Sequence, residues 1–312
     1  MNSSVAIAPS SWLETFPTPQ LWQWQGLNIC YQSMGDTGPA VILVHGFGAS
    51  WGHWRKVMPT MAQTCRVYAI DLVGFGASDK PTPGEPLPYT FETWGQQLVD
   101  FCREIVGGSA FFVGNSIGCI AAMQATVMAP TQFLGVVLLN CSVRMLHERR
   151  RADIPWHLQL STPIIQSLLG VSWFGRLFFK LLARPNTVRS VLREAYAQPE
   201  AVTDELVDIL MQPASDPGAA AVFTSFTRYS QGPLPEDLLA QSPCPTLILW
   251  GKDDPWEPLD MAKKWATLPA VEDFIVLENA GHCPQDEVPE RVSELALEWI
   301  AAKALNTAVP NS

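Results

Sequence analysis

Positive charge is scarce in this sequence. Its 312 residues contain 20 Lys and Arg against 30 Asp and Glu, which gives a formal net charge of −10. Proteins that bind nucleic acids need a basic surface that faces the phosphate backbone. The composition therefore argues against a nucleic-acid partner.

Closely spaced cysteines are also lacking. The seven cysteines are scattered, odd in number, and include no Cys-x-x-Cys motif. Secreted disulfide frameworks usually have an even number of cysteines, and many zinc sites contain Cys-x-x-Cys. We therefore expect a reducing compartment, with neither a disulfide framework nor a metal site, and no cofactor.

Signals for export or membrane insertion are missing as well. The first basic residue is Arg55, whereas secretory signals start with a basic region and transit peptides are rich in arginine. The most apolar window, residues 110–130, contains a Gly-x-Ser-x-Gly turn, so we interpret it as a buried core element and not as a membrane span. These absences predict a cytoplasmic protein.

One serine organises what the sequence does contain. Residues 114–118 read Gly-Asn-Ser-Ile-Gly, after an apolar run that suits a buried strand and before an Ala- and Met-rich run that suits a buried helix. A serine between the two occupies a tight, strained turn that pushes its hydroxyl out of the sheet edge, toward the amides of the helix N-terminus. This pattern predicts Ser116 as a nucleophile.

A serine hydroxyl is a poor nucleophile at neutral pH, so it needs a histidine base held by an acid. A predicted strand at 246–250 leads into a loop with Asp254, and a predicted strand at 273–277 leads into a loop with His282. The order serine, acid, histidine is the order expected for this kind of sheet. We therefore predict that these two residues complete the catalytic set.

The acid has a competitor, and each candidate also has a simpler interpretation. Asp253 is the alternative acid, but Asp254 is favoured because it lies further from the end of the strand. In the simpler interpretation, Asp254, which precedes Pro255, only helps to form a turn. In the same interpretation His282 is a loop histidine that caps a helix, and Ser116 is a turn residue. Catalytic roles are favoured because a strained elbow is costly without use.

Acyl transfer also needs hydrogen-bond donors for the oxyanion. The backbone amide of Ile117 follows the nucleophile directly, and that of Phe47 lies in a His-Gly-Phe-Gly loop after the apolar run at 40–44. We predict this pair as the donors. His45 is interpreted as a structural residue whose hydrogen bonds shape the loop.

These stretches together resemble the α/β-hydrolase family. The resemblance covers roughly residues 20–140 and 243–303 and rests on five motifs, which are the His-Gly-Phe-Gly loop at 45–48, the glycine loop at 71–81, the Gly-Asn-Ser-Ile-Gly turn at 114–118, residues 251–258, and Gly281-His282. It implies a serine hydrolase on a mostly parallel sheet with helices on both faces and a helical cap insertion.

Within the family, two motifs point to a particular branch. The Gly-Phe-Gly-x-Ser-Asp-Lys-Pro loop and the Asp-Pro-Trp-Glu stretch at 254–257 are similar to those of haloalkane dehalogenases, epoxide hydrolases and the pheophytinase-like esterases of cyanobacteria and chloroplasts. Dehalogenases and epoxide hydrolases place an aspartate at the elbow. Ser116 departs from them, and Asn115 before it is similar to the pheophytinase-like group.

The succession of elements predicts an α/β fold with an insertion. Strands and helices alternate up to about residue 140, which implies a parallel sheet covered on both faces. We expect a loose arm at 1–20, a core at 21–143 and 242–312, and a helical cap at 144–241. The predicted strands cover 21–25, 27–33, 40–44, 66–70, 111–113, 133–139, 246–250 and 273–277, and the predicted helices include 51–62, 91–106, 258–267 and 289–303.

The predicted cap differs from the rest in charge. Residues 144–193 contain nine Lys or Arg and two acids, a balance of +7 that leaves −17 for the remaining residues (−10 − 7). Basic residues recur every four positions on one helix face and apolar residues on another, a basic amphipathic pattern. The basic set is Arg176, Lys180 and Arg184, and the apolar set is Trp173, Phe174, Leu177, Phe178 and Leu181.

Two interpretations of this cap helix stay open. In the simpler one its apolar side roofs the pocket and its basic side faces water. In the other it is a membrane-facing lid that draws lipid-like esters from an anionic surface. Both predict an apolar pocket, with Asn115, Trp173, Phe174 and Phe178 as the substrate contacts.

We therefore expect a cofactor-free hydrolase that cleaves a carboxylic ester with a bulky apolar group through an acyl-enzyme. The pheophytinase-like motifs suggest a phytyl-type ester. Carbon–carbon bond hydrolysis and cofactor-free perhydrolysis use the same triad and remain alternatives. A third alternative is a non-catalytic ligand receptor on this fold. The sequence gives no indication of the oligomeric state.

Overall fold

The computed structural model describes residues 15–84, 86–153, 166–168 and 171–308. Most of the predicted N-terminal arm, residues 1–14, lies outside this set. Eight strands form one sheet in the order β1-β2-β4-β3-β5-β6-β7-β8. The strands are β1 (Gln20–Trp24), β2 (Leu27–Met34), β3 (Ala40–Val44), β4 (Arg66–Ile70), β5 (Ala110–Asn115), β6 (Phe133–Leu139), β7 (Thr246–Gly251) and β8 (Val271–Leu277).

The sheet is mostly parallel. β1 pairs antiparallel with β2, as the predicted hairpin requires, and β2 pairs antiparallel with β4, whereas every pair from β4 to β8 is parallel. The chain runs from β3 outward to β4 and then returns to place β5 on the other side of β3. At such a reversal the loops diverge beyond the carboxyl ends of the strands and leave a crevice there.

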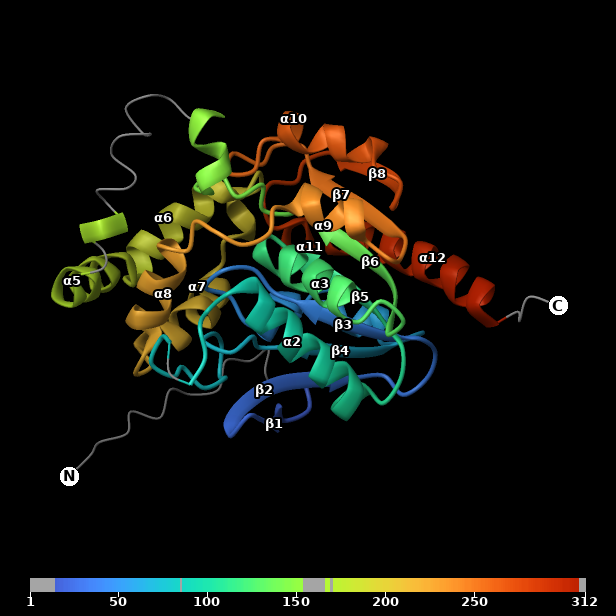
Figure 1. The fold of residues 1–312 in the computed structure, drawn as a ribbon, viewed down its shortest axis with the longest axis horizontal. Helices are drawn as coiled ribbons and strands as arrows, with labels where there is room; N and C mark the ends of the chain where they lie inside the picture. Colours follow the sequence, from blue (N-terminus) through green and yellow to red (C-terminus); the bar gives the residue numbers. More distant parts are fainter. Residues whose placement is uncertain (1–14, 85, 154–165, 169–170, 309–312) are drawn as a thin grey trace.

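Each central strand is apolar throughout because both faces of the sheet are covered. Alternate residues point to opposite faces, so Val41 and Leu43 of β3 belong to one core cluster and Ile42 and Val44 to the other. Figure 1 shows helices on both sides of the sheet. One layer contains α2 (Phe91–Phe101), α3 (Ile117–Met128) and α9 (Pro235–Gln241), and the other α1 (Met58–Met61) and α12 (Pro289–Ala308).

Several predicted helices are shorter or interrupted. The stretch at 51–62 is a 3₁₀ turn, η2 (Trp51–Trp54), followed by the short helix α1. Pro59 lies in the first turn of α1, where its missing N–H costs nothing, and this separates the two elements. The stretch at 258–267 similarly divides into α10 (Leu259–Ala262) and η7 (Lys263–Thr267).

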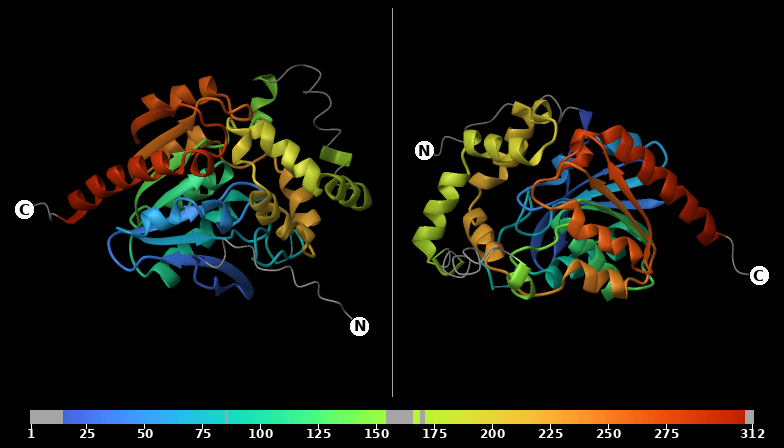
Figure 2. Two further views of the ribbon diagram at one scale, coloured as in Figure 1. Left: turned by 180° about the vertical axis from the view of Figure 1, so that it is seen from behind. Right: turned by 90° about the horizontal axis from the view of Figure 1, so that it is seen from above.

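Within the described part of the segment between β6 and β7, helices α5 to α8 lie beyond the carboxyl ends of the strands (Figure 2). They are α5 (Ser172–Leu182), α6 (Pro185–Ala195), α7 (Asp204–Met211) and α8 (Ala219–Thr227). We call these four helices the cap. Helix α9 belongs elsewhere, because its Leu238 and Leu239 are buried in the core cluster that contains α3.

One buried arginine ties the two ends of this segment together. Arg144, near its start, donates hydrogen bonds to the carbonyl oxygens of Tyr229, Gln231 and Pro233, near its end, at 3.1, 2.7 and 2.8 Å. Its guanidinium also lies 4.9 Å from the ring centroids of Phe91 and Tyr229. The cap is therefore anchored to the core where the chain enters and leaves it.

None of the helices in the described part of the chain combines the length and the apolarity needed to cross a bilayer.

Candidate active site

The predicted nucleophile lies in a strained turn. Ser116 joins β5 to α3 with φ 54° and ψ −120°, a region that residues with a side chain rarely adopt. A Cβ at position 118 would stand 2.2 Å from the carbonyl oxygen of Val44, and one at position 114 would stand 2.8 Å from the amide of Cys119. Both glycines are therefore required for the strand and helix to approach each other.

The two other predicted residues form a pair. Nδ1 of His282 lies 2.8 Å from Oδ2 of Asp254. A carboxylate only accepts, so Nδ1 carries the proton and Nε2 is left as the basic nitrogen. Asp253 is exposed, and of the two aspartates the structure brings only Asp254 to the imidazole.

The Asp254 carboxylate is held on several sides. Its Oδ1 accepts the backbone N–H groups of Trp256 and Glu257 at 2.8 and 3.1 Å. Its Oδ2 accepts a further hydrogen bond from Nδ2 of Asn140 at 2.7 Å. These donors hold the carboxylate in a fixed orientation toward the histidine.

Asn140 is a part of the site that the sequence reasoning missed. It follows β6 at a positive φ of 41°, and its Oδ1 accepts the amide of Gly251 at 2.8 Å while its Nδ2 reaches Asp254. It therefore links the ends of β6 and β7. The sequence did contain a signal for this residue, because asparagine tolerates a left-handed backbone conformation and here directly follows a predicted buried strand.

The charges around His282 determine its basicity. Burial alone lowers its pKa, but the hydrogen bond and the charge of Asp254, together with the charges of Glu257 and Glu287, outweigh burial and raise the pKa above its ordinary value. The ring also lies beside Trp256, with 5.1 Å between the two centroids. These carboxylates stabilise the charged imidazolium that forms when the ring takes a proton.

Asn115 connects the elbow to the histidine loop. Its Nδ2 donates to the carbonyl oxygens of Leu139 and His282 at 3.2 and 3.1 Å. Ser116 and His282 both line one cavity, together with Asn115. Among the hydrogen bonds of the described residues, none joins the Ser116 hydroxyl to the His282 ring, which is common in ligand-free active sites.

The predicted oxyanion donors lie at the same place. A Cβ on Gly46 would stand 3.1 Å from Oδ1 of Asn115 and 3.2 Å from Cβ of Ser116, so this loop lies directly against the elbow. Phe47 and Ile117 line the cavity. Neither of their amides donates a hydrogen bond to another residue in the described part of the chain, which leaves both for a ligand.

His45 shapes this loop. Its Nδ1–H donates to the carbonyl oxygen of Gly46 at 2.7 Å, and its Nε2 accepts the amide of Leu72 at 3.1 Å. Burial lowers its pKa to about 4, so the ring is neutral at pH 7. A neutral ring with both nitrogens used fits the structural interpretation made from the sequence.

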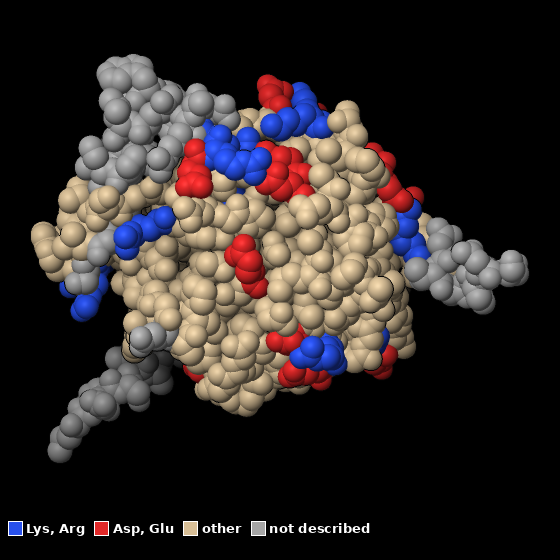
Figure 3. Space-filling view, viewed as in Figure 1, with Lys and Arg blue, Asp and Glu red and all other residues tan. Residues whose placement is uncertain are grey.

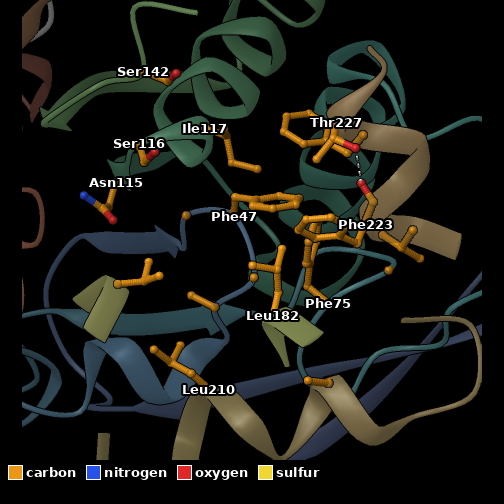
Figure 4. A pocket seen from close by; sticks show the side chains of 18 of the residues that line it. Phe47, Phe75, Asn115, Ser116, Ile117, Ser142, Leu182, Leu210, Phe223 and Thr227 are labelled. Carbon is orange, nitrogen blue, oxygen red and sulfur yellow. Dashed lines mark hydrogen bonds between the residues drawn. The ribbon is translucent and has the colours of Figure 1, made fainter. Parts of the chain in front are cut away.

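The cavity beyond the serine has a volume of about 580 Å³ and a mainly apolar lining (Figure 4). Phe47 and Phe75 come from the core, and Phe223 and Phe226 come from α8 of the cap. The ring centroid of Phe47 lies 5.5 Å from that of Phe223 and 5.0 Å from that of Phe226. Core and cap aromatics therefore form one continuous wall.

Helix α5 lines the cavity with other residues than the sequence analysis expected. Phe179 and Leu182 are in the lining, whereas Trp173, Phe174 and Phe178 are not. Trp173 is 67% exposed. The amphipathic pattern identified the helix, but the direction of its inner face depends on how α5 packs against α8, which the pattern does not contain.

The model of the alpha/beta hydrolase family matches residues 41–295. This chain belongs to the alpha/beta hydrolase family. That result confirms the resemblance and the fold class inferred from the sequence, and with them a hydrolase.

Individual relatives of low sequence identity are also hydrolases. The hydrolase is 26% identical to the chloroplastic pheophytinase of Arabidopsis thaliana over 311 residues, which cover 88% of this chain and 64% of that protein. It is also 26% identical to the 2-hydroxy-6-oxo-6-(2'-aminophenyl)hexa-2,4-dienoic acid hydrolase of Metapseudomonas resinovorans over 289 residues, 89% of each chain. A thermophilic esterase from Thermogutta terrifontis superimposes with a TM-score of 0.71 at 22% identity, covering 92% of this chain and 100% of the other, which shows the shared fold.

Two basic side chains line the cavity of this hydrolase, and both already have partners. Arg144 donates to three carbonyl oxygens, as described above. Lys80 donates to the carbonyl oxygens of Gly76 and Ser78 at 2.6 and 3.1 Å and pairs with Asp216 at 2.8 Å. The described lining therefore offers no unengaged lysine or arginine to a negatively charged substrate group.

Glu257 adds an acid to the lining, close to His282. Its Oε2 accepts the amide of Val143 at 2.8 Å. Burial raises its pKa to about 7, so that the carboxyl is partly protonated near neutral pH.

No group of three or more potential metal ligands occurs among the described residues.

Proposed function

We propose that this hydrolase cleaves a carboxylic ester with a bulky apolar group through a covalent acyl-enzyme. Ser116 is the nucleophile, His282 the base and Asp254 the acid that orients it. The single observation that carries the proposal is the His282–Asp254 pair, because His282 lines the same apolar cavity as a serine on a strained elbow and its Nε2 has no hydrogen-bond partner among the described residues.

The reaction has two halves, in which the enzyme is first acylated and the acyl-enzyme is then hydrolysed. Nε2 of His282 takes the Ser116 proton as Oγ bonds to the ester carbonyl carbon, and the amides of Phe47 and Ile117 hold the resulting oxyanion. The tetrahedral adduct then expels the alcohol, which receives the proton from His282. Water, activated by the same nitrogen, attacks the acyl-serine, and the carboxylic acid leaves as the Ser116 proton is restored.

The lining supports a neutral, apolar substrate. The walls are mainly aromatic and aliphatic, and burying such groups contributes roughly 25 cal/mol per Å² of apolar area removed from water. The engaged state of Lys80 and Arg144 and the presence of Glu257 disfavour an anionic group. The similarity to a pheophytinase supports a phytyl-type ester within this class.

Active-site labelling tests the proposal directly. A fluorophosphonate probe should react once per chain, and mass mapping should find it on Ser116. Labelling should vanish in Ser116→Ala and slow greatly in His282→Ala. A label on another residue, or equal labelling of the Ser116→Ala variant, would contradict the assignment.

The second candidate is hydrolysis of a carbon–carbon bond by the same residues, which the similarity to a hexadienoic acid hydrolase favours. A series of p-nitrophenyl esters compared with a vinylogous diketone separates the two. Turnover of esters that rises with acyl length supports the ester assignment, and turnover of the diketone alone supports the second. Stoichiometric binding without repeated turnover of either would indicate a ligand receptor.

A further inference from the structure

Helix α5 has two faces with different surroundings. Its inner face packs on α8, with 5.3 Å between the ring centroids of Phe179 and Phe223, and Phe179 and Leu182 line the cavity. On its outer face Trp173, Leu177 and Leu181 are 67%, 49% and 45% exposed. Large apolar side chains that gather on one exposed face commonly mark an interaction surface.

Basic side chains lie next to this apolar stripe. Arg176 and Lys180 are exposed and alternate along the helix with Trp173, Leu177 and Leu181. At about 100° per residue, these five side chains occupy roughly 140° of the helix surface, opposite the cavity-lining face. We call this set the α5 outer face.

The charges of the outer face differ from those of three other arginines in the segment between β6 and β7, which have acidic partners. Arg149 pairs with Asp237, Arg150 with Glu236, and Arg189 with Asp204. Among the described residues, no acid forms an ion pair with Arg176 or Lys180. In Figure 3, Lys and Arg side chains without adjacent Asp or Glu appear along the edge that α5 occupies in Figure 1.

We propose that the α5 outer face docks the protein onto an anionic lipid surface. An exposed helix with apolar residues, a tryptophan and flanking basic residues binds the boundary between lipid headgroups and acyl chains. Anionic lipid complements the charges of Arg176 and Lys180, which have no acidic partner in the part of the chain that the structure describes, whereas the rest of the chain is acidic and is repelled by such a surface. The helix lies at the periphery of the cap in both views of Figure 2.

Docking through this face would also place the cavity near the lipid. The docked helix is the one that carries Phe179 and Leu182 on its other side. An apolar ester in the bilayer would then be separated from the cavity by the thickness of one helix. The docking proposal does not depend on the proposed reaction, because binding to lipid needs no turnover.

Vesicle sedimentation with the full-length protein tests the docking. Vesicles of phosphatidylcholine alone should bind it weakly, and vesicles that also contain phosphatidylglycerol should bind it more strongly, with a loss of binding as salt increases. The Arg176→Gln/Lys180→Gln variant should bind anionic vesicles about 25-fold more weakly, since each basic residue contributes about 1 kcal/mol, or about five-fold. Leu177→Asp should weaken binding to both kinds of vesicle.

A matched control carries the same charge change elsewhere. Lys263→Gln/Lys264→Gln, on exposed residues of the core, should leave vesicle binding unchanged. All variants should keep their hydrolysis of a short water-soluble ester, because none of these residues lines the cavity. Equal binding to neutral and anionic vesicles, no binding, or an equal loss in the control variant would overturn the proposal.

A second copy of the chain is the competing occupant of the outer face. Sedimentation velocity over a range of protein concentrations should show one species in the absence of lipid, with the same mass for the wild type and Leu177→Asp. A dimer that dissociates in Leu177→Asp, combined with no binding to vesicles, would assign the face to self-association and overturn docking to lipid.

Discussion

The rim of the core and the cap face each other across one cavity, but they are held in different ways. At the rim, Ser116, Asp254 and His282 follow strand ends and are fixed by strained backbone or buried hydrogen bonds. In the cap, the wall is formed by rings such as Phe179 and Phe223, which pack through apolar contact. Hydrogen bonds fix direction, whereas apolar contacts fix proximity alone.

This difference indicates a division of roles. A proton transfer tolerates little displacement, so its groups belong on the rigid ends of parallel strands. A binding wall for an apolar group tolerates changes of shape, so it belongs on helices joined by loops. Substitutions at the rim should therefore affect the chemical step, and substitutions in the cap should affect the choice of substrate.

The largest expected effect distinguishes two neighbouring acids at the rim. Asp254→Asn removes the acceptor that fixes the proton on Nδ1 of His282 and should lower kcat by about 10⁴-fold. Asp253→Asn removes an exposed carboxylate that does not reach the ring and should leave kcat unchanged. Steady-state kinetics on one p-nitrophenyl ester measures both. Similar losses in the two variants would remove the distinction.

The next effect concerns the stability of the elbow. Gly118→Ala would place a Cβ 2.2 Å from the carbonyl oxygen of Val44 and should lower the free energy of unfolding by about 3 kcal/mol. Gly108→Ala is the control, because nothing lies within 4 Å of a Cβ there, and its effect should stay within about 0.5 kcal/mol. Urea denaturation followed by circular dichroism measures both. Equal stability of the two variants would show that the elbow is not closely packed.

A cap substitution should change selectivity and leave the chemical step intact. Phe223→Ala removes a ring that packs on Phe47 and Phe179, and should lower kcat/KM for a bulky ester about ten-fold relative to a short ester. Leu177→Ala, on the exposed side of α5, should leave this ratio unchanged. The measurement is a comparison of acetyl and long-chain p-nitrophenyl esters. An equal fall for both esters would mean that the ring supports the rim as well.

The smallest effect is a shift in pH dependence. His282 must be neutral to take a proton, so the rate should fall as the pH decreases through its raised pKa. Glu257→Gln removes one of the charges that raise this pKa and should move the acid limb of the profile to lower pH. The shift should be modest, because Glu257, with a pKa of about 7, is only partly ionised there.

Glu278→Gln provides the control for this pH shift, since Glu278 is exposed and pairs with Lys252 at 2.8 Å. Its profile should match that of the wild type. A shift of the acid limb to higher pH in Glu257→Gln would contradict the electrostatic account of His282.

The rim could be predicted well because its signals are local. The turn around Ser116 needs glycine on both sides, the loop after β7 contains two neighbouring acids, and the loop after β8 contains a histidine at a suitable distance from the strand. The contribution of Asn140 was not predicted, because it depends on β6 and β7 being neighbours in the sheet, and the order of the strands along the chain does not give their order in the sheet. The choice between Asp253 and Asp254 was likewise only an argument from turn length.

The cap was harder for a physical reason. A helical period shows that α5 has an apolar side, but Phe179 and Trp173 both belong to apolar positions, and only packing against α8 decides which faces the cavity. The contribution of Phe223 and Phe226 was not visible at all, because α8 is apolar over most of its surface and gives no direction.

The sequence by itself determined the fold class and the place of the insertion, and it reduced the candidate site to one serine, one histidine and two neighbouring acids, since each of these follows from short-range pattern and backbone geometry. The tertiary structure alone decided which aspartate meets the ring, which aromatic side chains close the cavity, and which face of α5 remains exposed. Those facts depend on contacts between segments far apart in the chain, where small rotations of a helix exchange its buried and exposed residues.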